Sequence, residues 1–93
     1  MIVGILNIEL YIPGSRSLKS KRSVVKSLKD RLNNSFNVSV AEIDYMDKWQ
    51  RTTLGVATVS NERRHAESVM QKVISKISEE FRVEIIKTSL KYI

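Results

Sequence analysis

The sequence contains no cysteine, one proline and three glycines among its 93 residues. The absence of cysteine excludes thiol catalysis, disulfides and thiolate metal sites, so nothing indicates an oxidising compartment. No apolar run approaches the roughly 20 residues that a membrane-spanning helix needs. The apolar start, Met1 to Leu6, has no basic segment before it, as a signal peptide would. We therefore expect a single domain, residues 1–93, in the cytoplasm and without a membrane role.

Acidic residues are scarce in one part of the chain. Sixteen basic and ten acidic residues give a net charge of +6. The segment from Arg16 to Arg31 holds seven of the basic residues and only one acid, Asp30, whereas the rest of the chain carries nine of each sign. Such a concentration of positive charge favours an acidic partner, although many basic proteins bind none.

The first half of the chain predicts a strand, a helix and a second strand. Apolar residues alternate from Ile2 to Ile12, which is typical of a strand with one buried face. Pro13-Gly14 ends this strand, and a helix is expected from an N-cap at Ser17 to about Asn33. The second strand runs from Phe36 to about Tyr45, and a shift in its alternation indicates a bulge.

The second half repeats this pattern. A strand rich in β-branched residues spans Thr52 to Ser60, and Ser60-Asn61 provides an N-cap signal for a helix that reaches about Phe81. A last strand covers Val83 to Ile93. Seven residues mark one apolar face of this second helix: Ala66, Val69, Met70, Val73, Ile74, Ile77 and Phe81.

Two successive strand-helix-strand units predict an α+β fold of the ferredoxin-like β-α-β-β-α-β type. Its four-stranded antiparallel sheet carries both helices on one face. The other face stays open to solvent, a ligand or a second subunit, and the alternation places Val3, Ile5 and Tyr11 on it.

Three segments of this sequence resemble the YlxP-like family of small bacterial proteins. They are Leu18 to Leu32 (LKSKRSVVKSLKDRL), Asn37 to Asp44 (NVSVAEID) and Asp47 to Asn61 (DKWQRTTLGVATVSN), of which DKWQR is the most specific. The resemblance implies a ferredoxin-like domain of unknown activity, often encoded beside genes for translation initiation and ribosome maturation. It implies no catalytic residues.

The first predicted helix carries a basic stripe, which we define as Lys19, Arg22, Lys26 and Lys29. Spacings of three and four residues place them along one flank of the helix, where cations can follow a row of phosphates. The alternative is an ordinary solvated helix face, because lysine and arginine are good helix formers.

Lys21 falls within the apolar stripe of the same helix. We expect its side chain to extend past the end of the sheet to solvent, with contact to a ligand as the alternative.

The connection from Asp47 to Arg51 combines a carboxylate, an indole, an amide and a guanidinium. Trp49 and Arg51 suit base stacking or phosphate binding. In the alternative reading, Trp49 covers the end of the core and Arg51 pairs with Asp47.

No enzyme or cofactor is indicated. Glu42 and Asp44 are expected on one side of a strand, but neither they nor His65 have the spacing of a metal site. The strand from Thr52 to Val59 lacks the aromatic residues of an RNA-recognition motif. The Pro13–Arg16 segment only faintly resembles an acylphosphatase loop, which leaves a phosphate-handling enzyme as a remote alternative.

The sequence therefore predicts a binding module associated with structured RNA, the ribosome or translation. The predicted nucleic-acid-binding residues are Arg16, Lys19, Arg22, Lys26, Lys29, Trp49 and Arg51. The alternative is a homodimer, or a domain that docks a protein, through the open face of the sheet.

Overall fold

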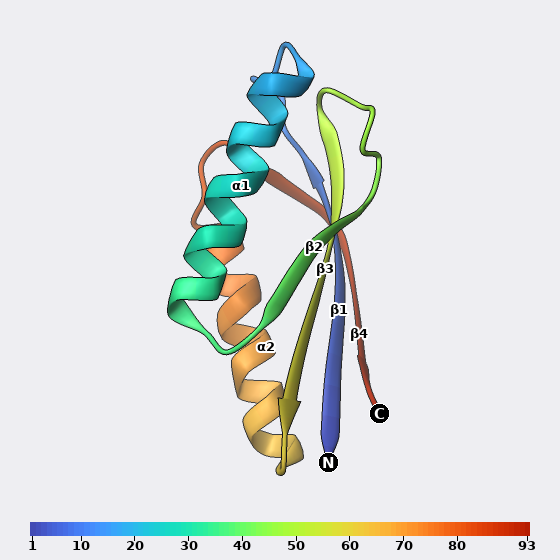
Figure 1. Ribbon diagram of the computed structural model, residues 1–93, viewed down its shortest axis with the longest axis vertical. Coiled ribbons are helices and arrows are strands. Elements are labelled where there is room, and N and C mark those ends of the chain that lie inside the picture. The colour runs from blue at the N-terminus through green and yellow to red at the C-terminus, as the bar shows by residue number, and fades with distance from the viewer.

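The six predicted elements form one sheet with two helices, and the first strand lies inside the sheet. The computed structural model describes residues 1–93, with elements β1 (Ile2–Tyr11), α1 (Leu18–Ser35), β2 (Ser39–Asp44), β3 (Arg51–Ser60), α2 (Arg63–Ser78) and β4 (Glu84–Tyr92) (Figure 1). The strands pair antiparallel in the order β2-β3-β1-β4. The ferredoxin-like prediction is confirmed, and β2 and β4 are the two edges of the sheet.

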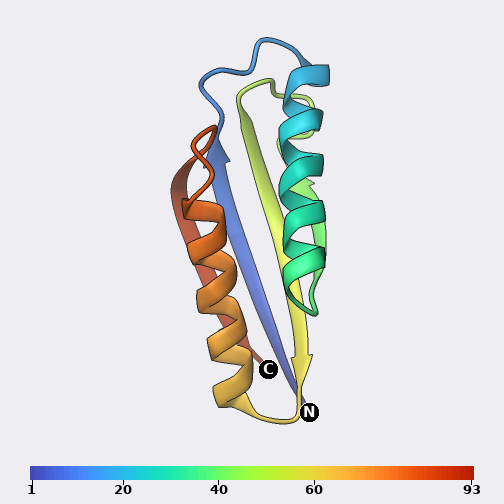
Figure 2. The same ribbon diagram turned by 90° about the vertical axis from the view of Figure 1, so that its left-hand side faces the viewer.

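Both helices cover the same face of the sheet, as Figures 1 and 2 show from two sides. The core between the layers consists of 14 buried apolar residues. Leu6, Ile8 and Leu10 of β1 have no exposed surface, because alternate residues of a strand point to the same side. Val3 and Ile5, on the opposite face, are only partly covered.

The predicted cap of α1 is present. The Ser17 side chain accepts a hydrogen bond of 3.0 Å from the Ser20 amide, which satisfies one of the free donors at the start of the helix. The helix continues to Ser35, two residues further than the Asn33 end that we predicted.

Strand β2 is shorter than predicted, since it begins at Ser39 rather than at Phe36. The bulge that its sequence indicated is confirmed, because the register with β3 shifts between Glu42 and Asp44. The shift places Glu42 opposite Leu54 and Asp44 opposite Thr53, which are neighbours on β3. Glu42 and Asp44 therefore lie on opposite faces of the sheet, contrary to the expectation that they share one.

Helix α2 differs from the prediction at both ends. Its N-cap is Glu62 without a side-chain cap, while the hydroxyl of Ser60 accepts a hydrogen bond from the Glu62 amide before the helix starts. The helix ends at Ser78, so Phe81 belongs to the connection that follows and is 92% exposed. The prediction that α2 reaches Phe81 and carries it on its apolar face is wrong, because the helix ends three residues before it.

The connection after α2 is fixed by the carboxylate of Glu80, which is 5% exposed. It accepts hydrogen bonds from Arg82 Nε at 2.8 Å and from Arg31 Nη1 of α1 at 2.6 Å. Arg82 also donates to the hydroxyl of Ser27 at 3.2 Å. These bonds join the connection before β4 to α1, and Phe81, which lies between Glu80 and Arg82, is exposed.

Low pH should weaken the hydrogen bonds that Glu80 accepts from Arg82 and Arg31. The hydrogen bond from Arg82 is the main cause that lowers the pKa of Glu80 from 4.5 to about 2, with a further contribution from Arg31. The contribution of Glu80 to stability is therefore complete above pH 4.5 and disappears as the pH falls from about 4.5 to about 2. We expect Glu80→Gln to lower the free energy of unfolding at pH 7 by about 1.5–3 kcal/mol and to flatten the acid side of its pH profile.

Urea unfolding between pH 2.5 and pH 7 measures this effect. Glu79→Gln is the matched control, because Glu79 is its exposed neighbour and makes no ion pair. Identical pH profiles for Glu80→Gln and the wild type would contradict the assignment.

Candidate functional site

Lys21 of α1 supports the connection between β2 and β3, and its side chain is completely buried. Its ammonium group donates to the carbonyl oxygens of Tyr45 at 2.7 Å, Met46 at 3.1 Å and Arg51 at 3.3 Å. It also forms an ion pair of 2.9 Å with the carboxylate of Glu42. The expectation that Lys21 reaches solvent is wrong, because these four oxygens give the buried charge a complete set of partners.

The backbone of this connection needs such support at Tyr45. Tyr45 is the one residue other than glycine with a positive φ, at 62°. Its amide donates to the Asp44 side chain at 2.7 Å, and its carbonyl accepts from the Lys48 amide at 3.0 Å in addition to Lys21. A left-handed conformation costs about 1 kcal/mol or more for a side chain of this kind, which these hydrogen bonds offset.

Gln50 joins the same connection to the turn between β1 and α1. Its side-chain amide donates to the carbonyl oxygens of Pro13 at 3.1 Å and Ser15 at 3.0 Å. Its own carbonyl accepts from the Ile12 amide at 2.8 Å. Hydrogen bonds therefore join the β2–β3 connection to the turn between β1 and α1 at this end of the sheet.

Arg51 points onto the open face of the sheet. Its Nε donates to the Glu9 carboxylate at 2.8 Å, and its guanidinium lies 5.0 Å from the centre of the Tyr45 ring. The hydrogen bond with Glu9 is the main cause that raises the pKa of Arg51. The pairing of Arg51 with Asp47 in our alternative reading is wrong, since its partner is Glu9.

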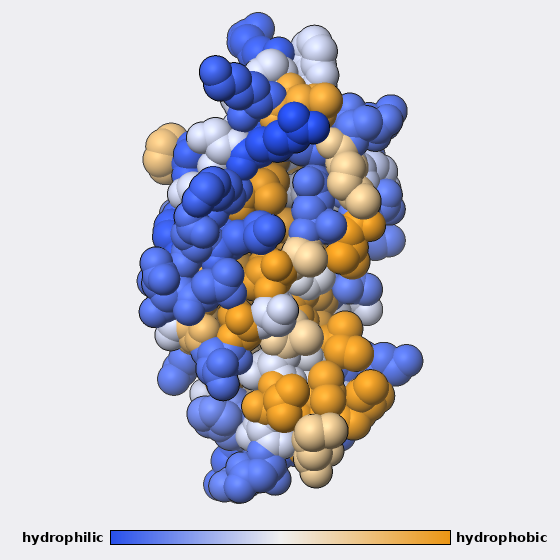
Figure 3. Space-filling model, viewed as in Figure 1, coloured by the Kyte–Doolittle hydropathy of each residue, from blue (hydrophilic) through white to orange (hydrophobic).

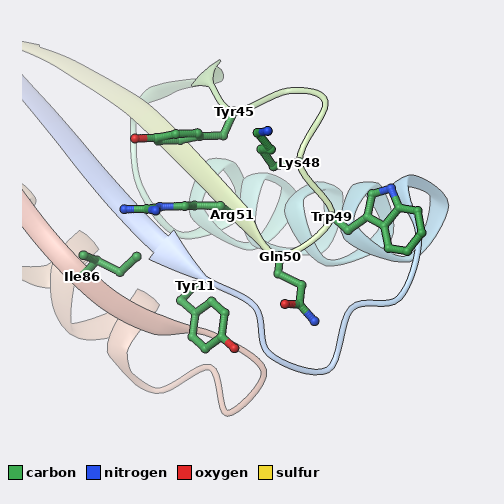
Figure 4. Close-up of a pocket in the computed structure, with 7 residues that line it drawn as sticks. All are labelled: Tyr11, Tyr45, Lys48, Trp49, Gln50, Arg51 and Ile86. Carbon is green, nitrogen blue, oxygen red and sulfur yellow. The ribbon is translucent and has the colours of Figure 1, made fainter.

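Trp49 does not cover the core, because its side chain is 56% exposed. The alternative reading of this residue is therefore wrong as well. Figure 4 shows the indole pointing away from the stacked pair of Tyr45 and Arg51. Nothing in the packing of the core requires a tryptophan here.

A cleft opens on this end of the open face, with a volume of about 610 Å³. Its lining residues, shown in Figure 4, are Tyr11, Tyr45, Lys48, Trp49, Gln50, Arg51 and Ile86. Of these, the sequence singled out Trp49 and Arg51 as binding residues, and the alternation placed Tyr11 on this face. The sequence carried no signal that Tyr45, Lys48 and Ile86 would meet there, because their positions depend on the connection and on the register of β4.

The basic stripe lies on the other layer of the molecule, along α1. Lys19, Arg22 and Lys26 are exposed and Lys29 is half-buried. Lys26 forms an ion pair of 2.8 Å with Asp30, a hydrogen bond that raises its pKa. The other three cations of the stripe have no ion-pair partner.

The stripe faces away from α2. At 100° per residue it lies across the helix from Arg31, whose guanidinium bonds to Glu80 in the connection after α2. It therefore borders the side of α1 nearest β2, and Figure 3 shows a continuous hydrophilic surface over α1 in this view.

The predicted nucleic-acid-binding residues do not form one site. The stripe belongs to the helical layer and Arg16 to the turn before α1, whereas Arg51 belongs to the open face of the sheet. The connection that carries Lys48 and Trp49 lies between these two surfaces, at one end of the molecule. A ligand that contacts all of them must pass around this end.

Comparison with known proteins places the chain in a family. Residues 3–90 match the family model described as Protein of unknown function (DUF503). The chain belongs to this family. It is also 43% identical over 74 residues to a protein of Bacillus subtilis (strain 168) described as "Uncharacterized protein YlxP", which covers 80% of each chain. The predicted YlxP-like membership is thus confirmed, and the family description assigns no function.

The fold has a counterpart among solved structures. A de novo designed protein with a ferredoxin fold, determined by solution NMR, matches with a TM-score of 0.59 and 13% sequence identity over 100% of this chain and 84% of the other. At this identity the match concerns the fold alone. No helix of the protein is long and apolar enough to cross a membrane.

Loss of the buried ammonium should destabilise the whole end of the sheet. Lys21→Met would leave the Glu42 carboxylate and three carbonyl oxygens without their shared donor. We expect the free energy of unfolding to fall by about 3–5 kcal/mol in urea denaturation, as for other buried ion pairs that lose one partner. Lys19→Met, two residues away and exposed, is the control and should change stability by less than about 0.5 kcal/mol. A loss below about 1 kcal/mol for Lys21→Met would show that Lys21 does not support the connection.

Proposed function

We propose that this protein is a nucleic-acid-binding module for structured RNA, such as RNA exposed on a ribosomal surface. The observation that carries this proposal is the row of four cations in the stripe, three of which have no ion-pair partner. Lys19, Arg22 and Lys29 make no ion pair within the chain, and Lys26 has only an exposed partner in Asp30. Side chains on neighbouring turns of one flank can contact successive phosphates of a backbone.

The alternative is an ordinary solvated helix face. Such a face does not require its basic residues to line up along one flank. In α1 the single acid is Asp30, which pairs with Lys26, and the first turn contains none. The N-terminal end of α1 lies beside the connection that holds Lys48 and Trp49, so Arg16 and Lys19 extend the same basic surface toward the open face. A polyanion that extends beyond the length of α1 is therefore a suitable partner.

Binding through the stripe should depend steeply on salt. With four phosphates contacted, log affinity for an RNA hairpin should fall with log salt concentration at a slope of roughly −3 to −4. Changing Lys19, Arg22, Lys26 and Lys29 together to glutamine should abolish most of this binding while the protein stays folded. Fluorescence anisotropy with a labelled hairpin at 50 to 300 mM salt measures both quantities.

The matched control changes four basic residues elsewhere to glutamine: Arg64, Lys72, Lys76 and Lys91. It has the same net charge as the stripe variant and should bind nearly as tightly as the wild type. Equal weakening of both variants would mean that net charge alone attracts RNA. Absence of any binding by the wild type would refute the proposal.

A second candidate function is self-association through the far end of the open face. There Val3 pairs with Val59 of β3 on one side and bonds to Ile93 on the other, with Ile5 following on the same strand. Val59 is 59% and Ile93 63% exposed. Figure 3 shows an apolar cluster at the lower right, where Figure 1 places both termini. Apolar patches of this kind are typical of contact surfaces.

If this patch joins two copies, light scattering at high concentration should give twice the 10.7 kDa mass of the chain. Val59→Lys should then give the monomer mass, because two lysines would be buried against each other. Ser68→Lys on the exposed side of α2 adds the same charge and should leave the dimer intact. A wild type that remains monomeric would eliminate this candidate.

A further inference from the structure

Four side chains form a row across the open face at the end that carries the cleft. Tyr45 follows β2 directly, Arg51 starts β3, Tyr11 ends β1 and Ile86 belongs to β4. The order β2-β3-β1-β4 places them side by side, and Tyr11 and Arg51 are direct register partners. All four line the cleft (Figure 4). Three strands of the sheet and the residue that follows the fourth thus each contribute one flat or apolar side chain to a single platform.

Two members of the platform, Tyr45 and Arg51, are held in place before any ligand arrives. The guanidinium of Arg51 is stacked on Tyr45 and bonded to Glu9, so its plane is fixed. The ammonium of Lys21 holds the carbonyl groups of both Tyr45 and Arg51. A ligand that binds here does not bear the entropic cost of ordering these side chains.

The charges around the platform define the ligand further. Glu9 neutralises Arg51, so Arg51 acts mainly as a flat stacking surface. Lys48 lines the same cleft, is exposed and makes no ion pair. The site therefore combines the exposed ring of Tyr11 and the stacked pair of Tyr45 and Arg51 with one cation at its rim that makes no ion pair. A planar aromatic group attached to a phosphate fits this combination.

We propose that the cleft binds one unpaired nucleobase of the RNA whose backbone lies along α1, with its phosphate at Lys48. This inference rests on the proposed function and adds the kind of RNA feature that is selected. A base within a duplex is stacked on both sides and does not reach such a platform, whereas a base in a loop or bulge does. The preferred ligand is therefore an RNA hairpin with an exposed loop rather than a continuous duplex.

The experiment compares a hairpin with a blunt duplex of the same stem sequence. We expect the wild type to bind the hairpin more tightly. Tyr11→Ala should weaken hairpin binding roughly 5- to 150-fold, the range for loss of one base-stacking contact, with little effect on the duplex. Tyr11→Phe should retain binding, because it keeps the ring. Phe81→Ala is the control for loss of an exposed aromatic residue, since Phe81 does not line the cleft.

A second measurement needs no variant of the platform. Trp49 is the only tryptophan and lines the cleft, so its fluorescence reports occupancy directly. Saturation with the hairpin should change this fluorescence, and saturation with the duplex should not. Lys48→Gln should reduce the salt slope for the hairpin by about 1, whereas Lys72→Gln on α2 should leave it unchanged.

The outcomes separate this inference from the proposed function. If the stripe variant loses binding while Tyr11→Ala binds like the wild type, the base platform is refuted and the backbone contact stands. Equal affinity for hairpin and duplex, or an unchanged Trp49 signal at saturation, refutes it in the same way. Failure of the wild type to bind either RNA refutes both proposals.

Discussion

The arrangement of the cleft end depends on one buried ammonium group. Lys21 has no exposed surface, and its position in the apolar stripe of α1 would be unfavourable without partners. It is stabilised because the connection between β2 and β3 turns its carbonyl groups inward and because Glu42 supplies a carboxylate. The dependence is mutual, since the connection adopts a left-handed residue at Tyr45 around the same charge. The positions of helix and connection therefore depend on each other, and the geometry of this end of the open face depends on both.

Two surfaces of different character meet at this end. The helical layer offers cations with few partners, which suits a long polyanion and gives little selectivity. The open face offers a preformed row of flat side chains, which suits one planar group and can select it. The short connection with Lys48 and Trp49 lies between them and is held by Gln50 and Lys21.

The sequence predicted the elements well, because periodicity reports which residues are buried together. The alternation of β1, the Ser17 cap and the bulge in β2 were all readable from local pattern. Phe81 was misplaced because the apolar pattern continues past the end of α2 at Ser78, whereas Glu80 beyond that end bonds to Arg31 of α1. The contact of Lys21 with Tyr45 spans 24 positions of the sequence, and that of Arg51 with Glu9 spans 42. The position of Tyr45 also depends on the register shift at the end of β2. Local pattern contains no information about such contacts, and the site is built mostly from them.

The two edges of the sheet are unequal, and this bears on how the protein behaves when concentrated. An unpaired edge invites the strand of another molecule, and repeated addition leads to fibres. β2 offers only six residues and is interrupted by its bulge, while β4 is longer but carries Lys87 and Lys91. Short length, irregularity and lysine are the features that discourage such growth. Neither edge of the sheet therefore favours the addition of a strand from another molecule.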